Sequence, residues 1–300
     1  MKKESSIKRY ARVKLNDKTL WANYLAVLGV LSSFVTFLSF FVTADDLRIN
    51  SVILFCVFLM LITGIFLFMW LCANNLQNVE LRINNTRVVI GQGDIWELIR
   101  KDPKERGGEI SVIAVNEFID HIVDNRIVSE KSLHGQYIKK LIADGKLLNF
   151  EKVVASDEIL NKDGNRVEVT TRRAGNKVRY SIGSVVEFES YVLAVFTKFD
   201  DDNKACLSAE EYTGFWMRFW ENIDEIYAGR TINIPLIGAG ITRFKNGKPT
   251  KQELLEIMLW TLKISGFHNT YADSKINIVI YPPDTAEIDL YHVRHNRNFR

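Results

Sequence analysis

A short glycine-containing segment is the first place in this sequence where residue types and spacing suggest chemistry. The β-branched apolar run 232–237 breaks into Gly-Ala-Gly-Ile-Thr over 238–242. Glycine has no Cβ, so its main chain can approach a ligand closely. Successive N–H groups can then form a nest that binds an anion without lysine or arginine. The segment is therefore either a phosphate-binding loop or simply the turn that ends a strand.

Two other predicted strands also end in small, polar or acidic residues. A Gly-Gln-Gly-Asp sequence that ends at Asp94 follows the strand 87–90, and Asn116 follows the strand 110–115. Ligands of open α/β sheets bind beyond the carboxyl ends of strands, so all three segments are expected on one rim. Asp94 can accept a hydrogen bond from an exocyclic amine such as that of adenine. Asn116 can both donate to and accept from a ribose hydroxyl.

Motifs, residue spacing and charge argue against several other kinds of site. The sequence has neither a Gly-x-x-x-x-Gly-Lys-Ser/Thr loop nor a complete Gly-x-Gly-x-x-Gly fingerprint with a downstream acid. Cys56, Cys72 and Cys206 form no metal-like pair, and the five histidines contain no His-x-x-x-His pair, so neither a zinc site nor a disulfide framework is expected. The net charge of +3, from 39 basic and 36 acidic residues among 300, gives no signal for nucleic-acid binding.

The elements that must position these segments alternate between strands and helices. Strands are predicted over 79–83, 87–90, 110–115, 191–196, 232–237 and 276–281. Capping boxes at Ser208-x-x-Glu211 and Thr250-x-x-Glu253 begin two amphipathic helices, which glycines at 229 and 266 end. This order predicts a three-layer α/β domain with a mixed, mostly parallel sheet and helices on both faces.

Two further features of this domain have a structural or a functional interpretation. The aromatic stripe that runs from Tyr212 to Tyr227 is interpreted as core packing rather than as a ligand site. Residues 164–184 predict a β-hairpin that turns near Gly175. The hairpin is strongly basic, with Arg166, Arg172, Arg173, Lys177 and Arg179. It is either a solvated edge strand, an assembly surface or an additional ligand contact.

Two uncharged apolar segments precede the α/β domain. Residues 20–42 and 51–72 each exceed the roughly 18 residues that cross a hydrocarbon core, and neither has the polar stripe of a buried soluble helix. They predict a transmembrane hairpin over 20–74. A secretory signal peptide is the alternative for the first segment, but its apolar run is too long and a second span follows at once.

Charge and polarity extend the membrane prediction. The tail 1–18 has seven basic and two acidic residues, which places it in the cytoplasm, and the hairpin returns residues 75–300 to the same side. The basic tail can also contact anionic lipid head groups. The first span has a mildly polar side formed by Asn23, Ser32, Ser33, Thr36 and Ser39. This side serves either a helix–helix contact or a pore lining.

Three segments together resemble macro domains, the modules that bind ADP-ribose. The segment VVIGQGDIWEL (88–98) resembles their Gly-Asp-Ile segment, and ISVIAVNEF (110–118) resembles the strand that leads to their Val-Asn-Ala-Ala-Asn motif. The segment IPLIGAGITRF (234–244) resembles their second phosphate loop. With residues 115–138 and the two leading spans, the chain from about residue 20 onward resembles the membrane-anchored macro-type effectors of the bacterial Thoeris antiphage system.

The resemblance implies a sensor in the bacterial inner membrane. Its domain organisation would be a basic cytoplasmic tail (1–19), a transmembrane hairpin (20–74) and a cytosolic macro-like domain (75–300). The ligand would be an ADP-ribose derivative, namely a histidine conjugate, made by a partner TIR-domain enzyme, with no other cofactor. Binding would lead to self-association, and the clustered hairpins would disrupt the bilayer.

The resemblance also assigns roles to residues. Asp94 would hold the adenine amine with Ile95 packed nearby, and Asn116 would reach the distal ribose. The second phosphate loop would consist of Gly238, Ala239, Gly240, Ile241 and Thr242. The first would lie near Ser132, Leu133, His134 and Gly135, where this sequence departs from the glycine-rich run of the family. That departure leaves His134 open between a structural histidine and a ligand contact.

A second departure bears on catalysis. Ile119 occupies the place where hydrolytic macro domains have the second asparagine of Val-Asn-Ala-Ala-Asn, so binding without hydrolysis is expected. Glu117, Asp120 and Asp124 could still supply a base, although acidic residues after a strand more often cap turns or face solvent. The alternatives are a membrane-tethered ADP-ribosylhydrolase and a membrane scaffold with a degenerate nucleotide-binding fold.

Overall fold

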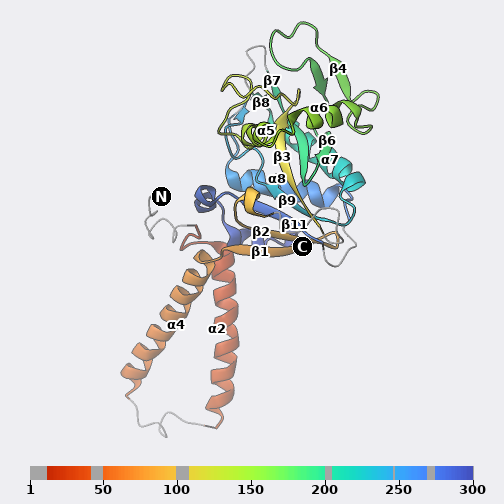
Figure 1. Cartoon of the computed structure of the whole chain (residues 1–300). Coiled ribbons are helices and arrows are strands. Elements are labelled where there is room, and N and C mark those ends of the chain that lie inside the picture. The colour runs from red at the N-terminus through yellow and green to blue at the C-terminus, as the bar shows by residue number, and fades with distance from the viewer. Residues whose placement is uncertain are drawn as a thin grey trace. The chain divides into compact units, whose positions relative to one another are not determined.

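The computed structural model describes residues 12–41, 50–98, 108–199, 205–245, 247–268 and 274–299 (Figure 1). These residues form two compact units. The first contains the chain up to Gln77 together with Asp289–Asn296, and the second contains Asn78–Ile288 and the last residues. Most of the predicted basic tail and the connection between the predicted spans lie outside the described residues.

Two long apolar helices dominate the first unit. They are α2 (Lys18–Ser39) and α4 (Ser51–Asn74), close to the predicted spans, and both are long and apolar enough to cross a membrane. Each begins at a side-chain cap, because Asp17 accepts a hydrogen bond from the Leu20 N–H and Asn50 accepts one from the Val52 N–H. A third, short helix, α9 (Leu290–His295), belongs to the same unit.

The polar residues of α2 find partners inside this unit. Asn23 donates from Nδ2 to the Tyr291 hydroxyl at 2.7 Å, which ties α9 to α2. The four hydroxyl groups donate to carbonyls of their own helix; these residues are Ser32, Ser33, Thr36 and Ser39. Such bonds satisfy a hydroxyl in an apolar surrounding without a neighbouring helix. The prediction that this side serves a helix contact or a pore therefore stays a prediction.

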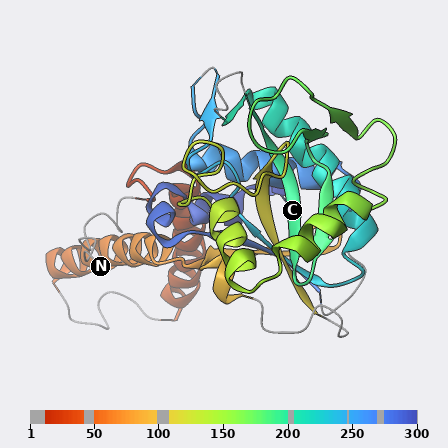
Figure 2. The same cartoon turned by 45° about the horizontal axis from the view of Figure 1, so that its top comes forward.

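The second unit is an α/β domain built on one large mixed sheet (Figures 1 and 2). Among the described residues the strand order is β1-β2-β11-β9-β3-β7-β8-β10, and β6 also pairs with β7. The strands are β1 (Asn78–Ile83), β2 (Thr86–Gln92), β3 (Glu109–Asn116), β6 (Val185–Phe188), β7 (Tyr191–Phe199), β8 (Ala205–Leu207), β9 (Thr231–Pro235), β10 (Arg243–Phe244) and β11 (Ile276–Ile280). All six predicted strands of the sheet are confirmed, whereas β6, β8 and β10 were not predicted.

The direction of the strands brings the predicted site segments together. The neighbouring strands β2, β11, β9, β3 and β7 all run parallel. The strands β1, β6 and β8 pair antiparallel with β2 or β7. The carboxyl ends of the five parallel strands therefore meet at one edge of the sheet, as the sequence predicted.

Helices cover both faces of the sheet, which confirms the three-layer prediction (Figure 2). On one face lie α5 (Leu133–Ala143) and α6 (Leu147–Ser156), which pack with Leu193 and Val195 of β7. On the other face lie α7 (Ala209–Ile226) and α8 (Lys251–Ile264), and Phe196 of β7 contacts Phe215 of α7 there. Both predicted capping boxes are present. The predicted core role of the aromatic stripe is confirmed, because its largest side chains are fully buried.

Short 3₁₀ helices complete the described elements: η1 (Ile95–Glu97), η2 (Pro282–Glu287) and η3 (Arg297–Phe299). The predicted hairpin also exists, since β4 (Arg166–Glu168) pairs antiparallel with β5 (Val178–Tyr180). Its strands are short, and the connection 169–177 is longer than the tight turn that the sequence suggested.

One arginine of this connection corrects the interpretation of the basic hairpin. Arg172 is 6% exposed and donates to both carboxylate oxygens of the fully buried Asp120, at 2.8 Å each. Its guanidinium lies 3.7 Å from the ring centre of Phe118. Arg172 is therefore neither a solvated edge residue nor an assembly or ligand contact. It joins the hairpin to the loop that follows β3.

Candidate functional site

A cleft of about 590 Å³ lies at the carboxyl ends of the parallel strands. Clefts of this size bind cofactors and drug-sized molecules. Eleven of the twelve predicted ligand residues line it: Asp94, Ile95, Asn116, Ser132, Leu133, His134, Gly238, Ala239, Gly240, Ile241 and Thr242. The exception, Gly135, is not among the lining residues. Segments that lie up to 148 positions apart in the chain thus share one cavity, from Asp94 to Thr242.

The loop after β9 has the conformation that its glycines allow. Gly238 has a φ of +89°, and a Cβ at this position would lie 3.1 Å from Cε2 of Tyr212. The Tyr212 hydroxyl donates to the Ile237 carbonyl at 2.9 Å, so this fully buried tyrosine of α7 fixes the start of the loop through its main chain. A side chain at 238 would both strain the backbone and meet this ring.

The second wall of the cleft is the N-terminus of α5. Ser132 is the N-cap, and its hydroxyl accepts a hydrogen bond from the Gly135 N–H at 3.0 Å. The first residues of the helix, Leu133 and His134, line the cleft. Free N–H groups and the positive end of the helix dipole make such a terminus favourable for phosphate. The predicted first phosphate loop is therefore a helix start.

Gly135 packs closely against the segment that precedes α5 and is not among the residues that line the cleft. A Cβ built on Gly135 would lie 2.2 Å from the main-chain oxygen of Ser129 and 3.1 Å from Cα of Glu130. Only glycine lets the first turn of α5 lie this close to the segment that precedes it. Its contribution to the cleft is indirect, because it fixes where the helix begins.

His134 is a buried histidine in the wall of the cleft. It is 5% exposed, and its Nε2 has no hydrogen-bond partner among the described residues. Burial lowers the pKa of His134 to about 4, and the negative charge of Asp120 and a hydrogen bond to its main chain oppose this shift only partly. The imidazole is therefore neutral at physiological pH. His134 thus lines the cleft with a neutral ring whose Nε2 is unpaired, and the choice between a structural histidine and a ligand contact stays a prediction.

The neutral state of His134 predicts a loss of stability in mild acid. The unfolded chain takes up a proton near pH 6.5, whereas the folded chain does so only near pH 4, so stability falls as the pH drops through this interval. Acidification from pH 7 to pH 5 is expected to lower the free energy of unfolding by about 2 kcal/mol through this group. The melting temperature should fall more steeply with decreasing pH for the wild-type chain than for His134→Gln. Parallel pH profiles would contradict the assignment.

The polar groups of Asn116 and Asp94 are partly engaged by their own loops. Oδ1 of Asn116 accepts from the N–H groups of Phe118 and Asp120, at 3.1 and 3.2 Å. Its Nδ2 is thus the group that can face a ligand, so the predicted ability to accept from a ribose is not retained. Oδ1 of Asp94 accepts from the Trp96 N–H at 3.0 Å, which leaves Oδ2 for an exocyclic amine.

The three candidate bases do not line the cleft. Glu117 is buried and accepts a hydrogen bond from the Phe199 N–H, and burial raises the pKa of its carboxyl group. Asp120 is paired with Arg172, and Asp124 accepts from two N–H groups of its own turn. Ile119, at the place of the catalytic asparagine, is buried with a φ of +48°.

Some lining residues were missed by sequence reasoning. Tyr281, which is 60% exposed, and Asp284 follow β11, and Lys131 precedes α5. The signal for the first two was present, because they follow a predicted strand just as Asp94 and Asn116 do. Applying the strand-end rule to that strand would have found them. Lys131 had no comparable signal, since its segment lies between elements.

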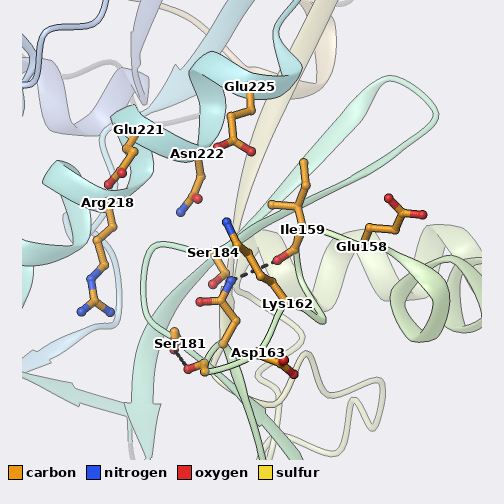
Figure 3. Close-up of a pocket in the computed structure, with 12 residues that line it drawn as sticks. Glu158, Ile159, Lys162, Asp163, Ser181, Ser184, Arg218, Glu221, Asn222 and Glu225 are labelled. Atoms are coloured by element: carbon orange, nitrogen blue, oxygen red, sulfur yellow. Dashed lines mark hydrogen bonds between the residues drawn. The ribbon is translucent and has the colours of Figure 1, made fainter.

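A second hollow of about 440 Å³ lies between α7 and the segment after α6 (Figure 3). Its amides serve the fold: Asn165 donates to the Ile159 carbonyl at 3.0 Å, and Asn222 donates to the Gly183 carbonyl at 2.9 Å. None of the strand-end segments contributes to it. We therefore place the functional site in the cleft at the strand ends.

Comparison with known proteins agrees with this geometry. The family description "Thoeris protein ThsA, Macro domain" matches residues 88–281, which include every lining residue of the cleft except Asp284. Thoeris protein ThsA of Bacillus amyloliquefaciens is 34% identical over 283 residues, which cover 93% of this chain and 90% of that protein.

The comparison with solved structures found, among others, two point mutants of an Oceanobacillus iheyensis macrodomain. The first is 15% identical with a TM-score of 0.42 and covers 73% of this chain and 96% of that chain. The second is 13% identical with a TM-score of 0.39 and covers 74% and 91%. The family match and the full-length relative decide the assignment: the chain belongs to the Thoeris ThsA family, and its α/β unit is the macro domain of that family.

Proposed function

We propose that this antiphage defence effector senses an ADP-ribose derivative with its macro domain and responds by self-association and membrane disruption. The observation that carries the proposal is the convergence of eleven predicted ligand residues on one cleft. Two of the converging segments, the start of α5 and the loop 238–242, offer main-chain N–H groups to an anion.

The cleft suggests how the ligand would lie. The adenine would sit near Ile95, with its amine on the free oxygen of Asp94. The diphosphate would lie between the start of α5 and the loop 238–242, and Nδ2 of Asn116 would donate to the distal ribose. In this arrangement the charged part of the ligand meets N–H donors, and its ends meet side chains.

We propose binding without hydrolysis. Hydrolysis needs a base within reach of the reacting ribose. The carboxylates of Glu117, Asp120 and Asp124 are directed to other partners, and Ile119 supplies no polar group. The ligand proposed is the histidine conjugate of ADP-ribose, made by a TIR-domain enzyme that need not bind the effector.

The two apolar helices are proposed to anchor the chain in the bacterial inner membrane, with both termini in the cytoplasm. Trp21 near the start of α2 and Trp70 near the end of α4 lie at the same end of the helical pair, together with Tyr291 of α9. Aromatic residues collect at membrane–water interfaces. Lys14 and Lys18, both exposed, lie at this end too, where anionic head groups attract basic side chains.

The effector step requires more than one chain. Two helices cannot enclose a pore, so membrane damage needs several hairpins. The signal must therefore bind the assembled state better than the resting state, since a ligand shifts an equilibrium only through differential affinity.

Calorimetric titration of the detergent-solubilised full chain tests this function. We expect ADP-ribose and its histidine conjugate to bind and to be recovered chemically intact, and we expect the conjugate to increase the particle mass in light scattering. Recovery of cleaved ligand would indicate an ADP-ribosylhydrolase instead. Lack of affinity for both compounds would leave a membrane scaffold with a degenerate fold.

Gly240→Glu is expected to abolish ligand binding without harming the fold. A Cβ on Gly240 meets no atom within 4 Å, so a side chain fits there, but a carboxylate would place a negative charge in the phosphate loop. Calorimetry should show a loss of ADP-ribose affinity that is at least about tenfold larger than in Gly240→Gln, the uncharged control of equal size. Equal affinity of the two variants would argue against a phosphate at this loop.

Asp94→Ala should weaken ADP-ribose binding by about tenfold in the same titration, because it removes the proposed hydrogen bond from the adenine amine.

A further inference from the structure

Lys248 makes an unusual contact with the phosphate loop. It lies between β10 and α8, and its Nζ donates to the carbonyl of Ala239 at 2.8 Å and to the carbonyl of Gly240 at 2.6 Å. These carbonyls belong to the loop that the proposed diphosphate would occupy. The ammonium group therefore binds the back of the loop, in addition to the Tyr212 hydroxyl on the Ile237 carbonyl.

Peptide geometry turns this contact into an orientation of donors. In a trans peptide unit the C=O and the following N–H point in opposite directions. Fixing the carbonyls of Ala239 and Gly240 on Lys248 therefore directs the N–H groups of Gly240 and Ile241 away from the ammonium. The Ala239 N–H is used within the loop, where it donates to the Leu236 carbonyl at 3.3 Å. The two N–H groups that Lys248 orients are thus available to an anion.

The carboxylates near Lys248 are bound by another lysine, so the ammonium group of Lys248 binds the loop. The neighbouring carboxylates of Asp284 and Glu287 are both bound by Lys251, at 2.7 Å each. Burial and the nearby Lys251 lower the pKa of Lys248, which the two carboxylates oppose. Its hydrogen bonds in the described part of the chain go to the two carbonyls.

We propose that Lys248 is a positioning residue for diphosphate binding, which holds the loop 238–242 with its N–H groups directed into the cleft and adds a positive charge behind them. The inference rests on the proposed function, since it names the residue that prepares the same site. Lys248 does not line the cleft, so it acts through the loop rather than by contact with the ligand.

The test compares Lys248→Met, Lys248→Arg and Lys245→Met in the detergent-solubilised full chain. Titration with ADP-ribose and, separately, with inorganic pyrophosphate should show affinities about tenfold lower in Lys248→Met. Lys248→Arg should restore most of the affinity, because arginine keeps the charge and can donate to both carbonyls. Lys245→Met is the matched control: it removes the same charge from the same segment, and Lys245 lies 3.6 Å from Glu211 rather than at the loop.

The outcomes separate this inference from the proposed function. Wild-type affinity in Lys248→Met, or equal losses in Lys248→Met and Lys245→Met, would overturn the role of Lys248 while the sensor proposal stands. Pyrophosphate binding that depends on Lys248, without any binding of ADP-ribose or of its histidine conjugate, would support the role and contradict the sensor. If the wild-type chain binds neither pyrophosphate nor either ADP-ribose compound, both proposals are overturned. The melting temperature of each variant is measured as a control for folding.

Discussion

Replacing Arg172 with methionine is expected to lower the free energy of unfolding by about 3–5 kcal/mol, because the substitution leaves the carboxylate of Asp120 buried without its cation. The pair is bidentate, both side chains are almost inaccessible to solvent, and the guanidinium also stacks on Phe118. The melting temperature of the full chain should fall by on the order of 10 °C. ADP-ribose affinity should fall as well, since Asn116 begins the loop that this pair holds.

Two further variants make this result specific. Arg173 is the neighbouring residue, it is exposed, and it makes no ion pair within the described residues. Arg173→Met should therefore change the melting temperature little. Combining Arg172→Met with Asp120→Leu should recover part of the lost stability, because no unpaired charge remains. A loss in Arg173→Met as large as in Arg172→Met would show that general charge, not this pair, supports the hairpin.

Replacing Gly135 with alanine is expected to destabilise the chain by about 3 kcal/mol, although helix propensity alone predicts a gain of about 1 kcal/mol. The difference comes from the main-chain oxygen of Ser129, which would lie 2.2 Å from the new Cβ. The start of α5 must shift to relieve this contact, and its N–H groups then leave the cleft. Thermal unfolding should show the loss of stability, and calorimetry should show about tenfold weaker ADP-ribose binding.

Gly214 provides the matched control for this substitution. It also lies in a helix, α7, but a Cβ there meets no atom within 4 Å. Gly214→Ala should therefore raise stability by about 0.5–1 kcal/mol and leave ligand binding unchanged. Opposite signs for the two glycines would establish the close approach at Gly135. A stabilising Gly135→Ala would show that the first turn of α5 does not pack as described.

The sequence by itself determined the elements whose information is local. Alternation of apolar residues located the parallel strands, the two Ser/Thr–Glu boxes located the starts of α7 and α8, and length located the two apolar helices. The rule that ligands bind beyond strand ends placed Asp94, Asn116 and the loop 238–242 on one rim before their neighbours in space were known. These predictions succeeded because backbone geometry and solvent exposure impose periods that can be recognised within a few residues.

The tertiary structure alone decided what depends on residues far apart in the chain. It paired Arg172 with Asp120, 52 positions away, where the sequence offered only a basic hairpin. It packed Gly135 against Ser129, buried His134 in a neutral state, and placed Lys248 behind the predicted phosphate loop. It also grouped residues 289–296 with the apolar helices rather than with the α/β unit. The sequence reads the same whether a charged or polar side chain faces water or a partner. Burial by distant segments determines the partner, the pKa and the role of that side chain.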